Sequence, residues 1–279
     1  MPGALQQQFR DQGYVVLPEF KSPAEIAAVR AQAGRIVEQF DPAESSAIFT
    51  TNEQQRSVDD YFMGSGDKIR CFFEEEAFEA TGQLKQDKLL SINKIGHALH
   101  DLDPVFDAFS RGRALEDLAR EVGLEQPLLW QSMYIFKQPG IGGEVRWHQD
   151  ASFFDTTPIS VTTFWFALED AHLGNGCLWV EPGGHRGPLR ERFVRSGNGA
   201  TIEKLDATAW PDAADSAVPL EVGAGTLAVF HGLLPHYSAA NRSPVSRHAY
   251  TLHATDARTR YSPANWLQRD GSLPVRGFL

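Results

Sequence analysis

Leu128-Leu129-Trp130-Gln131-Ser132-Met133-Tyr134-Ile135-Phe136 is the stretch of sequence that decides the fold. Its residues fall into two alternating sets, which is the period of a β-strand with two different faces. Further strand-like runs follow at 161–168, 177–180, 226–230 and 247–253. Gly, Pro and Asn clusters separate these runs, as turns between short strands do. The pattern predicts a β-sandwich or barrel over about residues 126–279, with the polar stretch 196–216 as a surface insertion.

The residues before this β-rich part are predicted to be mainly helical. Residues 22–25, Ser-Pro-Ala-Glu, form a capping box with proline at the first helical position. A second helix is expected at about 114–123, and a short strand at 14–17. No linker or repeat divides the 279 residues. We therefore expect one domain, with helical support over about 1–125 and the β core after it.

Composition limits the classes of function. The net charge of −10 argues against nonspecific binding to nucleic acid or anionic membranes, which needs a basic surface. No run approaches the roughly 18 apolar residues of a membrane span, and no secretory leader is expected from the first residues. Cys71 and Cys177 are the two cysteines and have no CxxC spacing. A reduced, cytoplasmic setting is therefore predicted. The sequence predicts no oligomeric state.

His148-Gln149-Asp150 is the first candidate for a site that carries chemistry. Residues i and i+2 of a strand face the same side, so His148 and Asp150 should point together while Gln149 points away. A distant histidine, His236, follows the run 226–230 and would complete the set. Two imidazoles and one carboxylate on one face of the metal are typical of non-haem Fe(II) sites, which leave other positions open.

Two further residues bear on this site. His231 ends the same apolar run, and spacing alone does not exclude it as the third ligand. Arg247 lies eleven residues beyond His236. Its guanidinium can hold a carboxylate with two parallel hydrogen bonds, which suits the far end of a 2-oxo acid such as 2-oxoglutarate. The alternative is an arginine at a strand end that reaches solvent or a structural aspartate.

These residues, taken in order, resemble the phytanoyl-CoA dioxygenase family of Fe(II)/2-oxoglutarate oxygenases. The resemblance covers most of the chain. The matching stretches are 9–17, 142–145, 148–153, 175–179, 182–185 and 262–267. Two more, 91–100 and 131–139, are typical of one branch of the family. Arg146-Trp147 departs from that branch just before the first ligand, which bears on the identity of the substrate.

The resemblance implies a fold and a set of site residues. The fold would be mainly β with flanking helices, a double-stranded β-helix (jelly-roll or cupin-like) barrel. By resemblance the iron ligands are His148, Asp150 and His236. The implied contacts to 2-oxoglutarate are Arg247, Ser238, Lys94, Met133 and Trp165. On residue type alone, the last three would be a surface lysine, a core methionine and a core tryptophan.

The predicted function is therefore oxidation of a small organic substrate with Fe(II), 2-oxoglutarate and O2, giving succinate and CO2. Hydroxylation is the expected outcome, although desaturation or rearrangement uses the same chemistry. The retained Asp150 argues against a halogenating variant. Arg146 and Trp147 are expected at the pocket mouth, where Arg146 would pair with an acidic group of the substrate. The alternatives are a cupin-like hydrolase or isomerase with Zn or Mn, and a non-catalytic protein that binds iron or 2-oxoglutarate.

Overall fold

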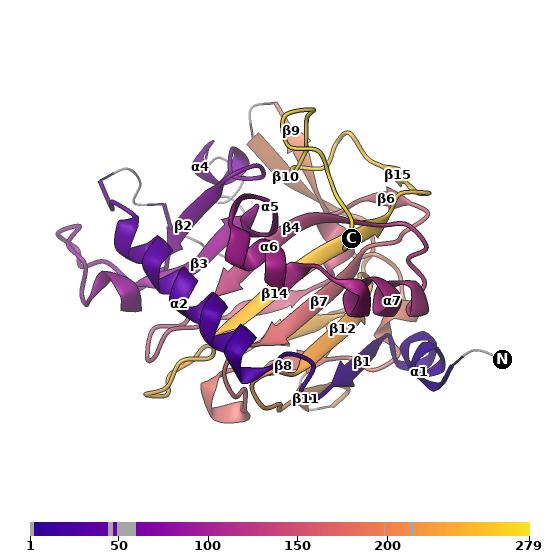
Figure 1. The fold of residues 1–279 in the computed structure, drawn as a ribbon, viewed down its shortest axis with the longest axis horizontal. Helices are drawn as coiled ribbons and strands as arrows, with labels where there is room; N and C mark the ends of the chain where they lie inside the picture. Colours follow the sequence, from indigo (N-terminus) through magenta and orange to yellow (C-terminus); the bar gives the residue numbers. More distant parts are fainter. Residues whose placement is uncertain (1–2, 44–46, 49–59, 198, 213–214) are drawn as a thin grey trace.

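Two β-sheets form the centre of the protein (Figure 1). The computed structural model describes residues 3–43, 47–48, 60–197, 199–212 and 215–279. The large sheet has the order β1 (Tyr14–Leu17), β12 (Leu227–His231), β7 (Thr162–Ala167), β14 (Ala249–Asp256), β4 (Pro127–Ile135), β3 (Ile92–His97) and β2 (Ile69–Phe73). The small sheet has the order β11 (Val218–Leu220), β8 (Leu178–Val180), β13 (His236–Ser238) and β5 (Val145–His148).

The connections between these sheets are those of a jelly roll. In chain order, β4, β7, β12 and β14 lie in the large sheet, whereas β5, β8, β11 and β13 lie in the small one. The chain therefore passes repeatedly from one sheet to the other, as in a double-stranded β-helix. The predicted fold class is confirmed. Among the described residues no strand of the large sheet pairs with a strand of the small sheet, so the two form a sandwich and no closed barrel is seen.

The first 125 residues contain more strand than their sequence indicates. The expected strand at 14–17 is β1, and the capping box of Ser22 and Glu25 begins α2 (Pro23–Gln39). The region also supplies β2 and β3, which extend the large sheet beyond β4. Five of the six residues of β3 are buried, so this strand lacks the alternation on which the prediction relied. The described residues of the stretch 196–216 are mostly exposed, but the stretch includes β10 (Gly199–Lys204), which pairs with β9 (Glu191–Ser196).

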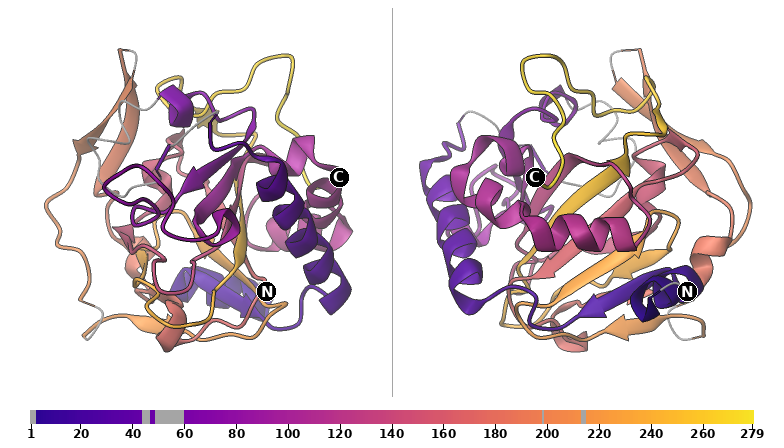
Figure 2. Two further views of the ribbon diagram at one scale, coloured as in Figure 1. Left: turned by 90° about the vertical axis from the view of Figure 1, so that its left-hand side faces the viewer. Right: turned by 45° about the vertical axis from the view of Figure 1, so that its right-hand side comes forward.

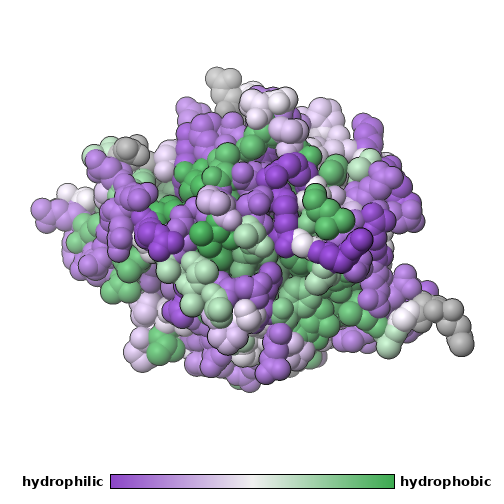
Figure 3. Space-filling view, in the orientation of Figure 1, coloured by the Kyte–Doolittle hydropathy of each residue, from purple (hydrophilic) through white to green (hydrophobic). Residues whose placement is uncertain are grey.

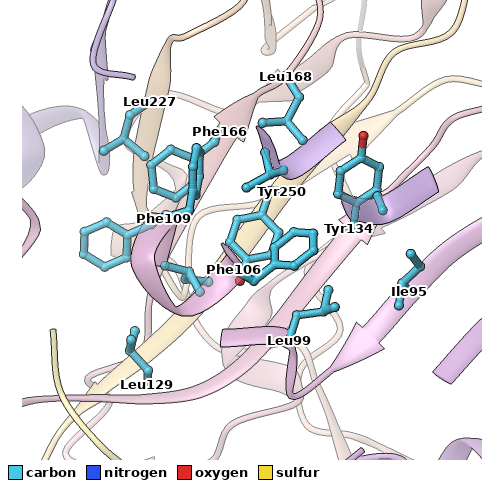
Figure 4. Packing of buried hydrophobic residues seen from close by; sticks show 14 of the residues in the cluster. Ile95, Leu99, Phe106, Phe109, Leu129, Tyr134, Phe166, Leu168, Leu227 and Tyr250 are labelled. Atoms are coloured by element: carbon cyan, nitrogen blue, oxygen red, sulfur yellow. The ribbon is translucent and has the colours of Figure 1, made fainter. Parts of the chain in front are cut away.

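Helices cover the outer face of the large sheet (Figures 1 and 2). They include α2, α5 (Leu99–Leu102), α6 (Pro104–Ser110) and α7 (Arg113–Glu121), while α1 (Ala4–Gln12) and α4 (Asp60–Met63) lie nearer the edges. Phe106 and Phe109 of α6 pack against Phe166 and Tyr250 of the sheet, with ring centroids 5.1 Å apart for Phe106–Tyr250 and for Phe109–Phe166 (Figure 4). This aromatic layer fixes the outer face of β7 and β14, whose inner faces carry the site.

A second apolar cluster lies between the two sheets. It combines residues of both sheets, namely Trp165, Ala167, Leu178, Val180, Leu220, Ala228, Phe230 and Ala249. The face of the molecule in Figure 3 is mostly hydrophilic, with hydrophobic residues gathered between α7 and β1. None of the helices in the described part of the chain has the length and apolar character that crossing a bilayer requires.

Buried charges tie the helices to the carboxy-terminal segment. The Asp101 side chain, 1% exposed, lies 2.7 Å from Arg111, 2.9 Å from Arg276 and 3.7 Å from Arg269. Arg269 is itself only 2% exposed. Removing one partner of a buried ion pair typically costs about 3–5 kcal/mol, because the remaining charge stays buried. We therefore expect Asp101→Ala to lower the free energy of unfolding by about this amount, measured by urea denaturation.

Asp107 provides the matched control for this prediction. It contacts the same Arg111 and Arg276, but its side chain is 40% exposed. Exposed pairs contribute about 0–1 kcal/mol, so Asp107→Ala should have a small effect. Equal losses of stability in the two variants would contradict the role assigned to Asp101.

Candidate active site

The His148-Gln149-Asp150 sequence lies where β5 ends, inside the sandwich. His148 is the last residue of β5, and Asp150 begins a short 3-10 helix (Asp150–Ser152) rather than continuing the strand. Gln149 is still extended, so its side chain points away from its two neighbours, as alternation requires. It accepts a hydrogen bond from the Arg190 N–H and donates to the carbonyl of Leu233. These bonds fix the segment that carries His148 and Asp150.

His236 joins this pair across the small sheet. It begins β13, which pairs with β5 so that His236 lies opposite His148. The Nε2 atoms of His148 and His236 lie 3.5 and 3.7 Å from the Asp150 Oδ1 atom. One ligand atom from each of the three residues lies within 4.8 Å of the others, which is close enough for a single metal ion. His231 instead packs beside Phe9 and His185, away from this cluster.

The hydrogen bonds of the two histidines set their tautomers. His148 Nδ1 lies 2.9 Å from the Arg146 carbonyl, and His236 Nδ1 lies 3.0 Å from the Leu234 carbonyl. A carbonyl only accepts, so each Nδ1 carries the proton and each Nε2 presents a lone pair. Burial, with a further contribution from His148, lowers the pKa of His236 to about 4. Both rings therefore have the arrangement common in metal-binding histidines, in which one nitrogen faces the metal and the other donates a hydrogen bond to the protein.

Asp150 is held by residues of the large sheet. Its Oδ2 accepts a hydrogen bond from the Thr163 hydroxyl and lies 3.6 Å from His253 Nε2. Burial alone would raise the pKa of this carboxyl group, but His236, His253 and His148 outweigh it and hold the pKa well below its usual range. Neither Thr163 nor His253 was among the site residues predicted from the sequence. Both face the same way as Trp165, so the two-residue period of β7 could have identified Thr163.

Arg247 lies in the same cavity, just before β14 begins. Its side chain is fully buried, and its Nη2 donates to the Ser238 hydroxyl at 3.1 Å. Nε donates to the Gly176 carbonyl at 3.2 Å, while Nη1 has no hydrogen-bond partner among the described residues. Burial lowers the pKa of Arg247 to about 10, so it stays charged near neutral pH. A buried guanidinium with an unused donor is suited to an anionic ligand.

Gly176 is required beside this arginine. Its φ is +79°, which favours glycine, and a side chain would meet the Ala239 carbonyl at 2.6 Å and Lys137 at 2.8 Å. The close approach brings the Gly176 carbonyl within reach of both Arg247 and Ser238. Within the predicted segment 175–179, the positive φ and the close contacts at position 176 explain why this residue is glycine.

The inner face of the large sheet forms the floor of the cavity. Met133, Thr251 and Trp165 lie side by side on β4, β14 and β7, because their strands pair in register at these positions. The Thr251 hydroxyl has no hydrogen-bond partner within the described part of the chain. Lys94, on β3, is 4% exposed, and its Nζ lies 3.5 Å from the Met133 sulfur. All five residues predicted to contact 2-oxoglutarate therefore line one cavity with the three predicted ligands.

The remaining walls are mainly aromatic. Phe153 packs beside His148, with ring centroids 6.2 Å apart, and beside Phe193 of β9 at 5.7 Å. Arg146 lines the cavity as predicted, but Trp147 does not. It stacks on Tyr237, which itself lines the cavity, at 5.4 Å. Trp147 follows Arg146 on a strand and so faces the opposite side.

Known proteins resemble this chain over nearly its whole length. The model of the family "Phytanoyl-CoA dioxygenase (PhyH)" matches residues 9–249. Phytanoyl-CoA dioxygenase of Arabidopsis thaliana is 47% identical over 94% of this chain and 91% of its own length. Phytanoyl-CoA dioxygenase domain-containing protein 1 of Bos taurus is 44% identical over 96% of this chain and 95% of its own length.

Solved structures share the fold at lower identity. EctD from S. alaskensis, crystallised with 2-oxoglutarate and 5-hydroxyectoine, has a TM-score of 0.64 and 22% identity, and the match covers 97% of this chain and 84% of that chain. The epimerase SnoN of nogalamycin biosynthesis, with Fe3+ and alpha ketoglutarate, has a TM-score of 0.65 and 16% identity over 98% and 91%. The family match confirms the predicted class of enzyme over the hydrolase and non-catalytic alternatives. The chain belongs to the phytanoyl-CoA dioxygenase family of iron- and 2-oxoglutarate-dependent oxygenases.

Proposed function

We propose that this protein hydroxylates a small organic substrate, with Fe(II) held by His148, Asp150 and His236. The observation that carries the proposal is the presence of two kinds of unused binding group in one cavity. One is the pair of imidazole Nε2 atoms beside the Asp150 carboxylate. The other is the buried Nη1 of Arg247. A metal ion and a dicarboxylate together match this donor set.

The residues that line the cavity have different proposed roles in binding 2-oxoglutarate and the metal. Arg247 and Ser238 would bind the C5 carboxylate of 2-oxoglutarate, and Met133, Trp165 and Lys94 would line its site. Burial of Arg247 excludes water from that contact and strengthens it. When bound, the iron with 2-oxoglutarate and O2 supplies the oxidising chemistry, with succinate and CO2 as co-products. Thr163 and His253 hold the Asp150 carboxylate in place.

The character of the walls supports a substrate with an apolar body and an acidic group. Phe153, Phe193 and Ile202 present an apolar surface next to His148. Arg146 lines the same cavity and is exposed, so it lies at the solvent side of the substrate space. A cation at this position would favour a carboxylate or another anion. Nucleic acid is not proposed as substrate, since the net charge of −10 offers no extended basic track.

A substrate screen tests this proposal. Succinate formation is measured with and without candidate small molecules, and the products are examined by mass spectrometry for the gain of one oxygen atom. Carboxylate-bearing compounds should stimulate the wild type but not Arg146→Ala. Arg242→Ala is the matched control, because Arg242 is 57% exposed and pairs with Glu76 instead of lining the cavity. Stimulation by an oligonucleotide alone, unaffected by Arg146→Ala, would contradict the proposed substrate class.

A further inference from the structure

We infer that Glu169 is a positioning residue that fixes Arg247 for its ligand, by binding the residues on either side of it. This inference rests on the proposed role of Arg247 in binding 2-oxoglutarate. Glu169 lies just beyond the end of β7 and does not line the cavity. It acts from the opposite side of the segment that carries Arg247.

The hydrogen bonds of Glu169 bracket the arginine. Its Oε2 accepts from the Ser246 hydroxyl at 2.7 Å and from the backbone N–H of His248 at 3.0 Å. Ser246 and His248 are the immediate neighbours of Arg247 in the chain. One carboxylate oxygen therefore restrains the backbone both before and after the residue whose side chain enters the cavity.

This restraint matters because Arg247 lies outside the regular strand. The β14 ladder begins at Ala249, and the Arg247 N–H makes only a long bond of 3.3 Å to the Lys137 carbonyl. A functional side chain carried by a strand or helix is held more accurately than one carried by a loop. At this position Glu169 provides the rigidity that the sheet does not.

The carboxylate of Glu169 is in turn held from the outer layer. Its other oxygen, Oε1, pairs with Arg30 of α2, and its side chain is 17% exposed. The His248 ring donates or accepts a 2.8 Å hydrogen bond with Tyr134 of β4. A chain of contacts therefore runs from α2 through Glu169 to the segment 246–248, and on to the large sheet. The two carboxylate oxygens of Glu169 therefore have different roles. Oε2 positions Arg247 through Ser246 and His248, whereas Oε1 holds Glu169 itself through Arg30.

The test is the affinity for 2-oxoglutarate, measured by calorimetry on the metal-loaded protein without O2. Glu169→Ala should raise the Kd for 2-oxoglutarate about ten-fold or more, as loss of a supporting residue commonly does. Glu169→Gln should raise the Kd less than Glu169→Ala does, because its amide oxygen can accept both bonds at the Oε2 position, whereas its NH2 group cannot accept from Arg30. Ser246→Ala, which removes one bond and spares the charge, should give an intermediate effect. In turnover, KM for 2-oxoglutarate should rise while kcat at saturation changes little.

Glu125→Ala is the matched control. Glu125 pairs with Arg258 at 2.6 Å, near the other end of β14, and loses the same charge without touching residues 246–248. Its Kd should equal that of wild type. An unchanged Kd in both Glu169→Ala and Ser246→Ala would overturn the inference. If Glu169→Ala does not fold, Ser246→Ala against wild type decides the question. Failure of the wild type to bind 2-oxoglutarate would instead overturn the proposed function.

Discussion

Turnover of 2-oxoglutarate is expected to disappear when Asp150 or His236 is replaced by alanine. A metal site that loses one of its three protein ligands loses affinity for Fe(II) and can no longer hold the ion in the required coordination geometry. Asp150 is the more severe case, because it supplies the only carboxylate of the cluster and also contacts all three neighbouring histidines, His148, His236 and His253. The expected result is loss of bound Fe(II), measured by metal analysis after equilibrium dialysis, with circular dichroism unchanged.

His231→Ala is the control for the iron prediction. His231 is the other histidine of the same strand-and-turn segment, and its Nδ1 accepts a hydrogen bond from the Leu233 N–H at 3.0 Å. It packs against Phe9, outside the cavity, so its replacement should leave iron content unchanged. The ligand assignment would be wrong if His231→Ala lost iron while His236→Ala retained it.

Arg247→Ala is expected to abolish tight binding of 2-oxoglutarate while leaving Fe(II) binding nearly unchanged. Truncating one partner of a buried charge-assisted pair costs about 2–5 kcal/mol. In Kd this is roughly 30-fold to several thousand-fold. Arg247→Lys should restore only part of the affinity, because an ammonium group cannot reproduce the two parallel bonds of a guanidinium. Titration calorimetry without O2 gives the Kd.

Ser238→Ala tests the hydrogen bond that holds the Arg247 guanidinium in position. Ser238 accepts from Arg247 and donates to the Gly176 carbonyl, so its loss leaves the charge in place but frees the guanidinium. Its effect on Kd should have the same direction as that of Arg247→Ala and be smaller. An unchanged Kd for 2-oxoglutarate in Arg247→Ala would contradict the proposal that Arg247 binds the C5 carboxylate.

The sequence predicted the alternating strands, and the structure brings the three proposed iron ligands, His148, Asp150 and His236, close together. The predicted run 128–136 coincides with β4 (Pro127–Ile135) to within one residue at each end, and it alternates because one face meets the helices and the other meets the cavity. β2 and β3 escaped prediction because they are largely buried on both faces, so no two-residue period marks them. The family resemblance, rather than spacing, selected His236 over His231. The structure then placed the two in different surroundings.

The supporting residues were harder to predict, since their role depends on contacts between distant segments. Thr163 reaches Asp150 from another sheet, and Glu169 reaches Ser246 and His248 from the end of β7. Nothing in their local sequence distinguishes them from an ordinary strand threonine and a surface glutamate. Arg247 could be proposed from the sequence because it lies eleven residues beyond His236 and because a guanidinium can hold a carboxylate with two hydrogen bonds.

The most direct test of the account is the conversion of 2-oxoglutarate to succinate by the purified protein, with and without added Fe(II), under O2. Wild type should form succinate only when both Fe(II) and O2 are present. Slow formation is expected even when no organic substrate is added. His236→Ala and Arg247→Ala should form none at the same concentrations of iron and 2-oxoglutarate. Succinate formation by wild type that does not depend on Fe(II), or that persists in His236→Ala, would contradict the central claim.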